Sequence, residues 1–301
     1  MNCSKRSCSN SAIVHQRYSG LHLCDVHFVE DVERKVKREM RKRLMVERGD
    51  TIAIALSGGK DSSALLLMLT RLFHNRPDLT FFAIAVDEGI YGFRAVTLAH
   101  AEQLANQLGV DFFRFSFAEE FGVTLNQIAS RGFEQAPCTF CGVLRRKLLD
   151  RKAKELGATK MATAHNLDDE VQTIMINYLR GDLQRLARLN GRREEFVPRI
   201  KPLRDVPEKE IALYAFLAGI PLITASCPYA ARSFRFSVKG MLNELERKHP
   251  GTKYAVMRGY QRLAEFLPHA ESSQILLRCE RCGDASATRI CKACAILERM
   301  Q

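Results

Sequence analysis

The sequence lacks any long apolar run and has no apolar segment close to its first residue. No stretch of the 301 residues approaches the roughly 18 uninterrupted apolar residues of a membrane span, so we expect no transmembrane helix and no membrane association. Residues 1–11 are polar and basic, which argues against a secretory signal and predicts a cytoplasmic protein. With hydrophobic residues at 46% and charged residues at 27%, a mostly disordered chain is also excluded.

Acidic residues are in short supply relative to basic ones. The chain has 34 Asp and Glu against 46 Lys and Arg, which gives a formal net charge of +12. Such a surplus favours a polyanionic partner, most commonly a nucleic acid. An ordinary solvated surface would also account for it, so charge alone shifts the interpretation only modestly.

Cysteine, by contrast, is abundant and clustered. Stable disulfides are disfavoured in a cytosolic chain, so clustered cysteines indicate metal or redox chemistry. The strongest signal is a C-terminal ribbon of two Cys-x2-Cys knuckles, formed by Cys279, Cys282, Cys291 and Cys294. A looser N-terminal set, for which His22 is a competing ligand, comprises Cys3, Cys8, Cys24 and His27. Both sets have the ligand types of structural zinc sites.

Three cysteines remain, namely Cys138, Cys141 and Cys227. Three thiolates would leave one position of a tetrahedral zinc site open. The first two would suit a redox pair, which needs no third cysteine, whereas all three would suit an iron–sulfur cluster. Buried, inert cysteine is a further interpretation. Spacing alone does not decide among these interpretations.

A basic segment follows the N-terminal cysteines. Seven of the ten residues from 34 to 43 are Lys or Arg. Apolar residues recur every four positions, at Val32, Val36, Met40 and Leu44, which predicts a helix over 31–48 with one narrow docking stripe. Its basic face either contacts phosphates or is an ordinary solvated surface.

Strands and helices alternate from 51 to about 225. Apolar runs predict strands at 51–56, 80–86, 111–117, 160–164 and 220–224. Helices are expected around 65–69 and at 93–108, 142–156 and 168–180, and 207–268 is largely helical. This alternation implies βαβ units and a doubly wound parallel sheet of the α/β class.

The predicted domains follow from these patterns. They are an N-terminal zinc finger (1–30), a basic linker helix (31–48), a central α/β domain (49–230), a helical extension (231–270) and a C-terminal zinc ribbon (271–301).

The sharpest motif is Ser57-Gly58-Gly59-Lys60-Asp61-Ser62, which joins a buried strand to a helix. Its glycines let backbone N–H groups face an anion, and the helix N-terminus adds partial positive charge. Lys60 supplies a point charge, Asp61 a place for magnesium and Ser62 a hydroxyl group. The G-x-x-x-x-G-K spacing of a Walker loop is absent.

Residues 57–62, 87–89 and 165–169 all follow strand ends, so they should converge at one sheet edge.

These residues resemble a known family. The hexapeptide is similar to the pyrophosphate loop of the PP-loop N-type ATP pyrophosphatases, which cleave ATP to AMP and pyrophosphate. Within that superfamily, Cys-Thr-Phe-Cys-Gly at 138–142, Ala-His-Asn-Leu-Asp-Asp-Glu at 164–170 and the two zinc modules resemble the tRNA 2-thiouridine synthetases of the TtuA, NcsA and Ctu type. The resemblance covers nearly the whole chain. The first knuckle departs from it with x4 where x2 is usual, and Ala164 replaces the usual glycine.

The resemblance implies a set of ligands and cofactors. Cys138, Cys141 and Cys227 would hold a 4Fe–4S cluster with one iron free to bind hydrosulfide, and each terminal module would hold Zn²⁺. ATP with Mg²⁺ would be bound by Ala55, Ser57, Gly58, Gly59, Lys60, Asp61, Ser62, Val86, Ala164 and Asp169. The implied catalytic residues are Cys138, Cys141, Cys227, Lys60, Asp61 and Asp169. We also expect the basic residues Arg145, Arg146 and Lys147 to contact tRNA phosphates.

The expected function is that of an ATP-dependent tRNA uridine 2-sulfurtransferase. Adenylation of the uracil C2 oxygen creates AMP as a leaving group, which the cluster-bound sulfide displaces. The expected partners are tRNA, a sulfur donor (sulfide or a ubiquitin-like thiocarboxylate protein) and a second copy of the chain in a homodimer. The alternatives are a tRNA cytidine 2-thiolation enzyme, a tRNA-modifying ligase of the same superfamily and a non-enzymatic zinc-ribbon tRNA-binding protein. The paired zinc modules argue against the cytidine enzyme, and the central cysteines argue against the ligase. The intact loop and the three central cysteines argue against the binding protein.

Overall fold

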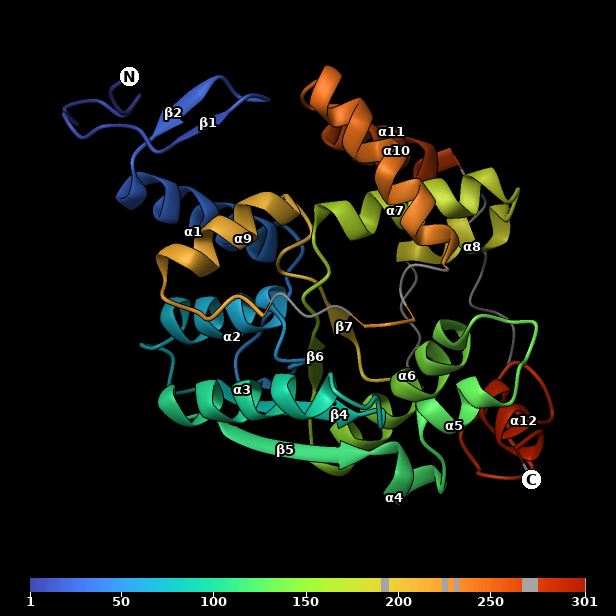
Figure 1. Ribbon diagram of the computed structural model, residues 1–301. Coiled ribbons are helices and arrows are strands. Elements are labelled where there is room, and N and C mark those ends of the chain that lie inside the picture. Colours follow the sequence, from blue (N-terminus) through green and yellow to red (C-terminus); the bar gives the residue numbers. More distant parts are fainter. Residues whose placement is uncertain (191–194, 224–226, 230–232, 267–275, 301) are drawn as a thin grey trace.

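The computed structural model describes residues 1–190, 195–223, 227–229, 233–266 and 276–300 (Figure 1). Its centre is a five-stranded sheet in which every neighbouring pair of strands is parallel. The strand order is β5 (Asp111–Ser116), β4 (Thr80–Asp87), β3 (Thr51–Ala55), β6 (Lys160–Ala162) and β7 (Arg199–Ile200). The chain builds outward from β3 first on one side and then on the other, which makes β3 and β6 the switch point. The predicted α/β fold class is confirmed.

The fifth strand is not where the sequence predicts it. The prediction at 220–224 is wrong for residues 220–223, which form no strand, and residue 224 lies outside the described residues. Gly219 adopts a left-handed φ of 71° after α9 (Glu208–Leu217), and the Ile220 N–H bonds back to the last turn of that helix at 2.9 Å. Pro221 then has no N–H to offer a strand neighbour. This apolar segment therefore caps a helix, and β7 takes the fifth position in the sheet.

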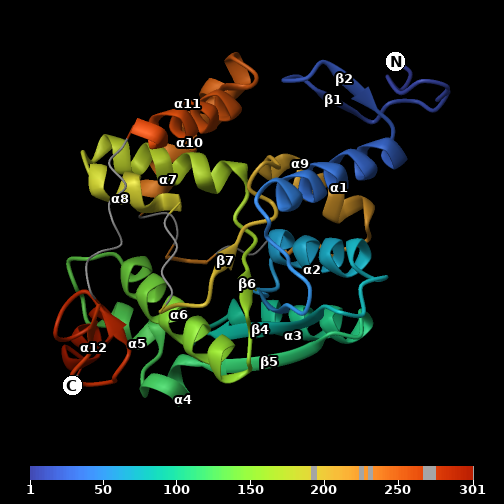
Figure 2. The same ribbon diagram turned by 180° about the vertical axis from the view of Figure 1, so that it is seen from behind.

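Helices cover both faces of the sheet (Figures 1 and 2). Because successive residues of a strand point to opposite faces, Ile52 and Ile54 of β3 pack on one side and Ala53 on the other. The side of Ile52 is covered by α2 (Lys60–Leu72), α3 (Arg94–Gln107), α9 and α1 (Asp25–Lys42). The side of Ala53 is covered by α6 (Pro137–Glu155).

Two predicted helices have different ends in the structure. The basic helix α1 begins at Asp25 and ends at Lys42, rather than spanning 31–48. Leu44, predicted to continue the apolar stripe, lies beyond the helix at a φ of 48° and is 72% exposed, and Met45 takes the buried place. Helix α6 begins at Pro137 and not at 142, because proline is favoured in the first turn, where its missing N–H is not needed.

A second layer of helices stands beyond the sheet edge formed by β6 and β7. It comprises α7 (Leu167–Leu179), α8 (Leu183–Ala187), α10 (Phe234–Lys248) and α11 (Thr252–Phe266), which share one apolar cluster. The remaining elements are short. They are β1 (Val14–Gln16), β2 (Leu21–Leu23), α4 (Phe117–Phe121), α5 (Leu125–Ser130), η1 (Arg188–Asn190), β8 (Leu277–Arg278), β9 (Ala285–Ser286) and α12 (Lys292–Glu298). None of the described helices combines the length and apolarity that a bilayer crossing requires.

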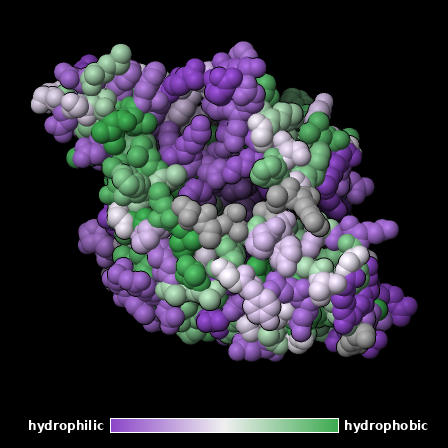
Figure 3. Space-filling model, in the orientation of Figure 1, coloured by the Kyte–Doolittle hydropathy of each residue, from purple (hydrophilic) through white to green (hydrophobic). Residues whose placement is uncertain are grey.

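A buried polar cluster attaches the N-terminal hairpin to the sheet domain. Glu210 of α9 accepts hydrogen bonds from Gln16 at 3.1 Å and from Tyr18 at 2.5 Å, and pairs with Lys35 of α1 at 2.7 Å. Tyr18 also packs against Tyr254 of α11, with ring centroids 4.8 Å apart. Hydrophilic residues gather around the hollow between this hairpin and the α10–α11 pair (Figure 3). The hairpin is therefore held by both helical layers.

Removing the Glu210 carboxylate should destabilise the fold. We expect Glu210→Ala to lower the free energy of unfolding by about 2 kcal/mol, because Tyr18 would lose its acceptor and only Asp31 would remain to pair with Gln16 and Lys35. Urea denaturation followed by circular dichroism measures this change. Glu244→Ala, which removes an exposed ion pair on α10, is the matched control and should leave the urea midpoint unchanged. Equal losses in the two variants would contradict the assignment.

Candidate active site at the carboxyl edge of the sheet

The loop 57–59 leaves β3 and turns directly into α2. Gly58 lies in this loop at a φ of 79°, and a Cβ atom there would sit 1.8 Å from the Thr97 carbonyl oxygen of α3. Its own carbonyl lies 3.1 Å from His100 Nδ1. Both the left-handed backbone and the close approach of α3 therefore require glycine at this position.

Hydroxyl groups shape the interior of the loop. Ser62 is buried, and its Oγ accepts a hydrogen bond from the Ser57 N–H at 3.1 Å and donates one to the Gly59 carbonyl at 3.0 Å. The sequence motif predicts that this hydroxyl binds a ligand, but in the structure it closes the loop. Ser57 remains exposed at the surface of the site.

An acidic and basic cluster surrounds the start of α2. Lys60 Nζ lies 2.9 Å from Asp61 and 3.0 Å from Glu208 at the start of α9. Burial raises the pKa of Asp169 to about 6, and the nearby Asp61 and Glu208 charges add to this. Burial also raises the pKa of Asp61, although Lys60 opposes it. The site therefore concentrates carboxyl groups whose charge is costly without a cation.

These carboxyl groups fit a magnesium ion. Oδ1 of Asp61 is buried and makes no hydrogen bond of good geometry, although the Asn166 side chain lies close enough to lower its pKa. Asp169 follows in the first turn of α7, where its backbone N–H bonds to Asn166 at 3.0 Å. Carboxylate oxygens are the ligands that Mg²⁺ prefers. Asp61 and Asp169 are thus the described residues best suited to hold it.

The other residues expected to bind the nucleotide lie at neighbouring strand ends. Ala55 ends β3, Val86 is the penultimate residue of β4, and Ala164 follows β6 by two positions. Since β3 lies between β4 and β6, the structure brings all three to the same edge as the loop. That their backbone groups bind an adenosine moiety stays a prediction.

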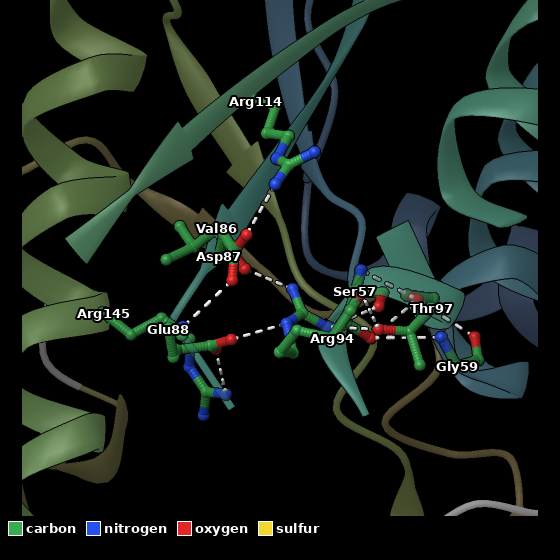
Figure 4. Close-up of polar contacts among 11 residues, drawn as sticks. Ser57, Gly59, Val86, Asp87, Glu88, Arg94, Thr97, Arg114 and Arg145 are labelled. Carbon is green, nitrogen blue, oxygen red and sulfur yellow. Dashed lines mark hydrogen bonds and ion pairs between the residues drawn. The ribbon is translucent and has the colours of Figure 1, made fainter. Parts of the chain in front are cut away.

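A buried arginine connects the loop to the end of β4 (Figure 4). Arg94, which is 5% exposed, donates to the Ser57 carbonyl at 2.9 Å and to the Val86 carbonyl. Its Nε lies 2.6 Å from Glu88, and the other Glu88 oxygen lies 3.3 Å from Arg145 on α6. The phosphate loop, the end of β4 and α6 are therefore joined by consecutive charged contacts.

The three central cysteines lie together beyond this connection. Cys138 and Cys141 lie in the first turns of α6, whereas the helix predicted over 142–156 would leave them in a loop ahead of it. Together with Arg145 they follow an i, i+3, i+7 spacing, which is one face of a helix. Cys138 Sγ donates to the Tyr229 carbonyl at 3.4 Å, and Cys227 packs into the same apolar cluster as Cys141.

The three central thiols are partly or fully buried and are spaced more widely than the terminal cysteines. Burial raises the pKa of the Cys141 thiol to about 12 and also raises the pKa of Cys138, with Cys227 adding to both. A thiolate here needs a strong cationic partner such as a metal. In each terminal tetrad, all ligand atoms lie within 4.8 Å of one another. Among the described residues, the three central thiols do not form such a close group. This wider placement suits a cluster, in which each thiolate binds a different iron.

Both terminal tetrads gather their ligand atoms within 4.8 Å. A tetrahedral zinc with Zn–S bonds of about 2.3 Å holds its sulfurs about 3.8 Å apart. The Cys8–Cys24 and Cys282–Cys291 sulfur separations are 3.9 and 3.8 Å. His27 joins the N-terminal set with Nδ1 3.2 Å from Cys24, while His22 stacks on His15 instead. Each tetrad is thus arranged so that it could hold a zinc ion, and His27 rather than His22 completes the N-terminal set.

The C-terminal ribbon packs directly on α6. Lys147 donates to Cys282 Sγ at 3.0 Å and pairs with Asp284. Ala293 and Ile296 of α12 share the apolar cluster that contains Cys141. The ribbon is therefore one wall of the cysteine site.

A cleft of about 1440 Å³ opens beside the sheet edge and extends to the C-terminal ribbon. Its lining has thirteen Lys and Arg against five Asp and Glu. His165 lines this cleft, and its side chain is accessible from it. Desolvation between the cleft walls lowers the pKa of its imidazole, and the charges of Lys201 and Arg199 add to this effect. The cleft is thus suited to a polyanion.

The basic residues expected to contact tRNA have diverse surroundings. Arg145 and Lys147 have acidic partners, in Glu88 and Asp284, whereas Arg146 lines the cleft with no ion pair to a described residue. On α1, a shallow groove of about 360 Å³ is lined by Arg34, Lys37, Arg38, Arg41 and Lys42.

The sequence predicts residues 87–89, and so Glu88, at this sheet edge, but it assigns Glu88 no role. Arg94, Glu208 and Lys239 of α10 also lie at the site, and no local motif predicts them.

The comparisons agree with this architecture. A PP-loop domain model matches residues 29–238, and the model of the N-terminal LIM domain of 2-thiouridine synthetase TtuA matches residues 2–29. The chain is thus a PP-loop protein. It is 40% identical to tRNA 2-thiolation protein NcsA of Haloferax volcanii, over 100% of this chain and 99% of the relative. It is 33% identical to cytoplasmic tRNA 2-thiolation protein 1 of Caenorhabditis briggsae, over 98% and 80%.

A solved structure supports the same assignment. The chain is similar to the U34-tRNA thiolase NcsA from Methanococcus maripaludis, solved with its [4Fe–4S] cluster, with a TM-score of 0.86 and 36% identity over 99% of this chain and 96% of that one. The chain belongs to the tRNA 2-thiolation protein family. The resemblance identified from the sequence is confirmed.

Adding a methyl group at Gly58 should open the phosphate loop. We expect Gly58→Ala to weaken MgATP binding by at least roughly tenfold, because both the φ of 79° and the 1.8 Å approach to Thr97 become unfavourable. Isothermal titration calorimetry measures the affinity. Gly181→Ala is the control, since Gly181 has a φ of 65° and open space around its Cβ position. Similar losses in both variants would show that the close contact is unimportant.

Loss of the C-terminal zinc site should expose the cysteine helix. We expect Cys282→Ser to reduce the amount of bound zinc. In iron-free protein it should also accelerate alkylation of Cys141 by roughly tenfold, because the ribbon would no longer pack against α6. Mass spectrometry of the alkylated protein measures this rate. Cys8→Ser should also reduce zinc but leave Cys141 protected. An unchanged Cys141 rate in Cys282→Ser would refute the packing role.

Proposed function

We propose that this protein is an ATP-dependent tRNA uridine 2-sulfurtransferase that forms 2-thiouridine and releases AMP and pyrophosphate. The observation that carries the proposal is the placement of the phosphate loop and the three central cysteines, which Arg94, Glu88 and Arg145 connect. Relatives named for tRNA 2-thiolation support the choice of substrate.

The phosphate loop holds the ATP that adenylates the C2 oxygen of the substrate uracil. Backbone N–H groups at the start of α2 and the Lys60 ammonium bind the pyrophosphate portion. Asp61 and Asp169 hold Mg²⁺, while the ends of β3, β4 and β6 bind the adenosine. The α-phosphate then faces the edge of the sheet, where the uracil C2 oxygen attacks it.

The cysteine trio supplies the sulfur side of the site. Cys138, Cys141 and Cys227 are the residues that would hold a [4Fe–4S] cluster, as the similar thiolase NcsA contains one. When bound, such a cluster supplies a Lewis-acidic iron for a sulfur nucleophile. Arg145 projects from the same helix face, so its positive charge stabilises anionic groups there.

The basic cleft binds the tRNA. Arg146, Arg199 and Lys201 line it close to the strand ends, where phosphate contacts would place a uridine at the sheet edge. The sulfur donor is sulfide or a ubiquitin-like thiocarboxylate protein, and the protein acts in the cytoplasm as a homodimer. The two zinc modules flank the PP-loop domain, with the boundaries given above, and each packs against it.

The test is tRNA-dependent AMP formation together with 2-thiouridine analysis of the tRNA by mass spectrometry. We expect Cys227→Ala to abolish 2-thiouridine formation and leave MgATP affinity unchanged, because the trio and the phosphate loop are separate groups of residues. Thr139→Ala, an exposed substitution between Cys138 and Cys141, should remain active.

Two results would contradict the proposal. An active Cys227→Ala variant would favour a redox pair of Cys138 and Cys141. Wild-type protein that binds tRNA without forming AMP would instead indicate a tRNA-binding protein without enzymatic activity.

A further inference from the structure

Helix α10 brings a second lysine to the phosphate loop. Lys239 Nζ lies 2.7 and 3.0 Å from the two carboxylate oxygens of Glu208. Glu208 in turn lies 3.0 Å from Lys60 Nζ. One carboxylate is therefore shared between the loop lysine and a lysine from a helix that begins 174 positions later in the chain.

Three helices start at this point. α2 begins at Lys60, α9 at Glu208 and α7 at Leu167, and the Glu208 N–H donates to Asp168 at 2.9 Å. Helix N-termini carry partial positive charge, so their convergence favours an anion. The two lysines add full positive charges to the same place.

The position of Lys239 is fixed by the preceding turn of α10. Arg235 donates to Gln172 at 3.1 Å and to Thr173 at 3.0 Å on α7. Arg235 and Lys239 are four residues apart and so lie on the same helix face. The contact of α10 with α7 therefore holds the Lys239 side chain above the loop.

We propose that Lys239 binds the ATP phosphates together with Lys60, and that Glu208 occupies the place of a phosphate group between the two lysines until the nucleotide enters. The inference rests on the proposed function in that it takes ATP as the ligand. A carboxylate between two ammonium groups makes the same charge-assisted contacts as a phosphate oxygen. The PP-loop domain match ends at residue 238, one position before Lys239.

Calorimetric titrations with MgATP, magnesium pyrophosphate and AMP test the proposal. We expect Lys239→Ala to weaken ATP and pyrophosphate binding by roughly tenfold and to leave AMP binding unchanged, since the lysine contacts the phosphates that AMP lacks. Lys239→Arg should retain most of the affinity. Lys248→Ala, at the far end of α10 beside Glu244, is the control and should bind all three ligands normally.

A second variant tests the role of Glu208. We expect Glu208→Gln to bind ATP and pyrophosphate at least as tightly as the wild type, because the competing negative charge is gone. Weaker binding in Glu208→Gln would overturn this role and indicate that the carboxylate holds the metal.

Unchanged ATP affinity in Lys239→Ala, or an equal loss for AMP, would overturn the assignment of Lys239. Failure of the wild-type protein to bind MgATP would instead overturn the proposed function itself, so the two failures are distinguishable.

Discussion

The buried ion pair of Arg94 and Glu88 is the constraint on which both halves of the site depend. These residues are 5% and 3% exposed, and an unpaired charge at such depth would cost several kcal/mol. Pairing with Glu88 leaves the other Arg94 donors to bind the Ser57 and Val86 carbonyls, so one side chain joins the loop to the end of β4. The remaining Glu88 oxygen faces Arg145, which extends the constraint to the cysteine helix. Consecutive charged contacts thereby join the proposed nucleotide site to the proposed cysteine site.

The fold class and four of the five strands could be predicted from the sequence, since buried parallel strands are continuous apolar runs. β7 could not, because a strand of two residues, Arg199–Ile200, leaves no pattern. The segment at 220–224 has the right composition, but Gly219 and Pro221 direct it into a helix cap. Similarly, the apolar spacing that predicts Leu44 on the α1 stripe says nothing about where the helix ends, and Met45 is buried in its place.

The candidate site was predictable to the extent that it is local in sequence. The hexapeptide at 57–62 and the paired cysteines of α6 are short motifs whose residues are neighbours in the chain. Glu208 and Lys60 are 148 residues apart and meet only because α2 packs on α9. Arg94 and Lys239 likewise stand in ordinary helical sequence, where a basic side chain is usually solvated. Their roles depend on tertiary packing, which spacing does not encode.

The docking of the N-terminal hairpin has a consequence for biosynthesis. Gln16 and Glu210 are bonded across 194 residues, and the apolar face of α1 packs with the α9 residues Ile211 and Ala215. A chain is synthesised from its N-terminus, so two thirds of it must leave the ribosome before this face is covered. Until then the N-terminal module and α1 lack the α9 contacts that hold them in the folded protein.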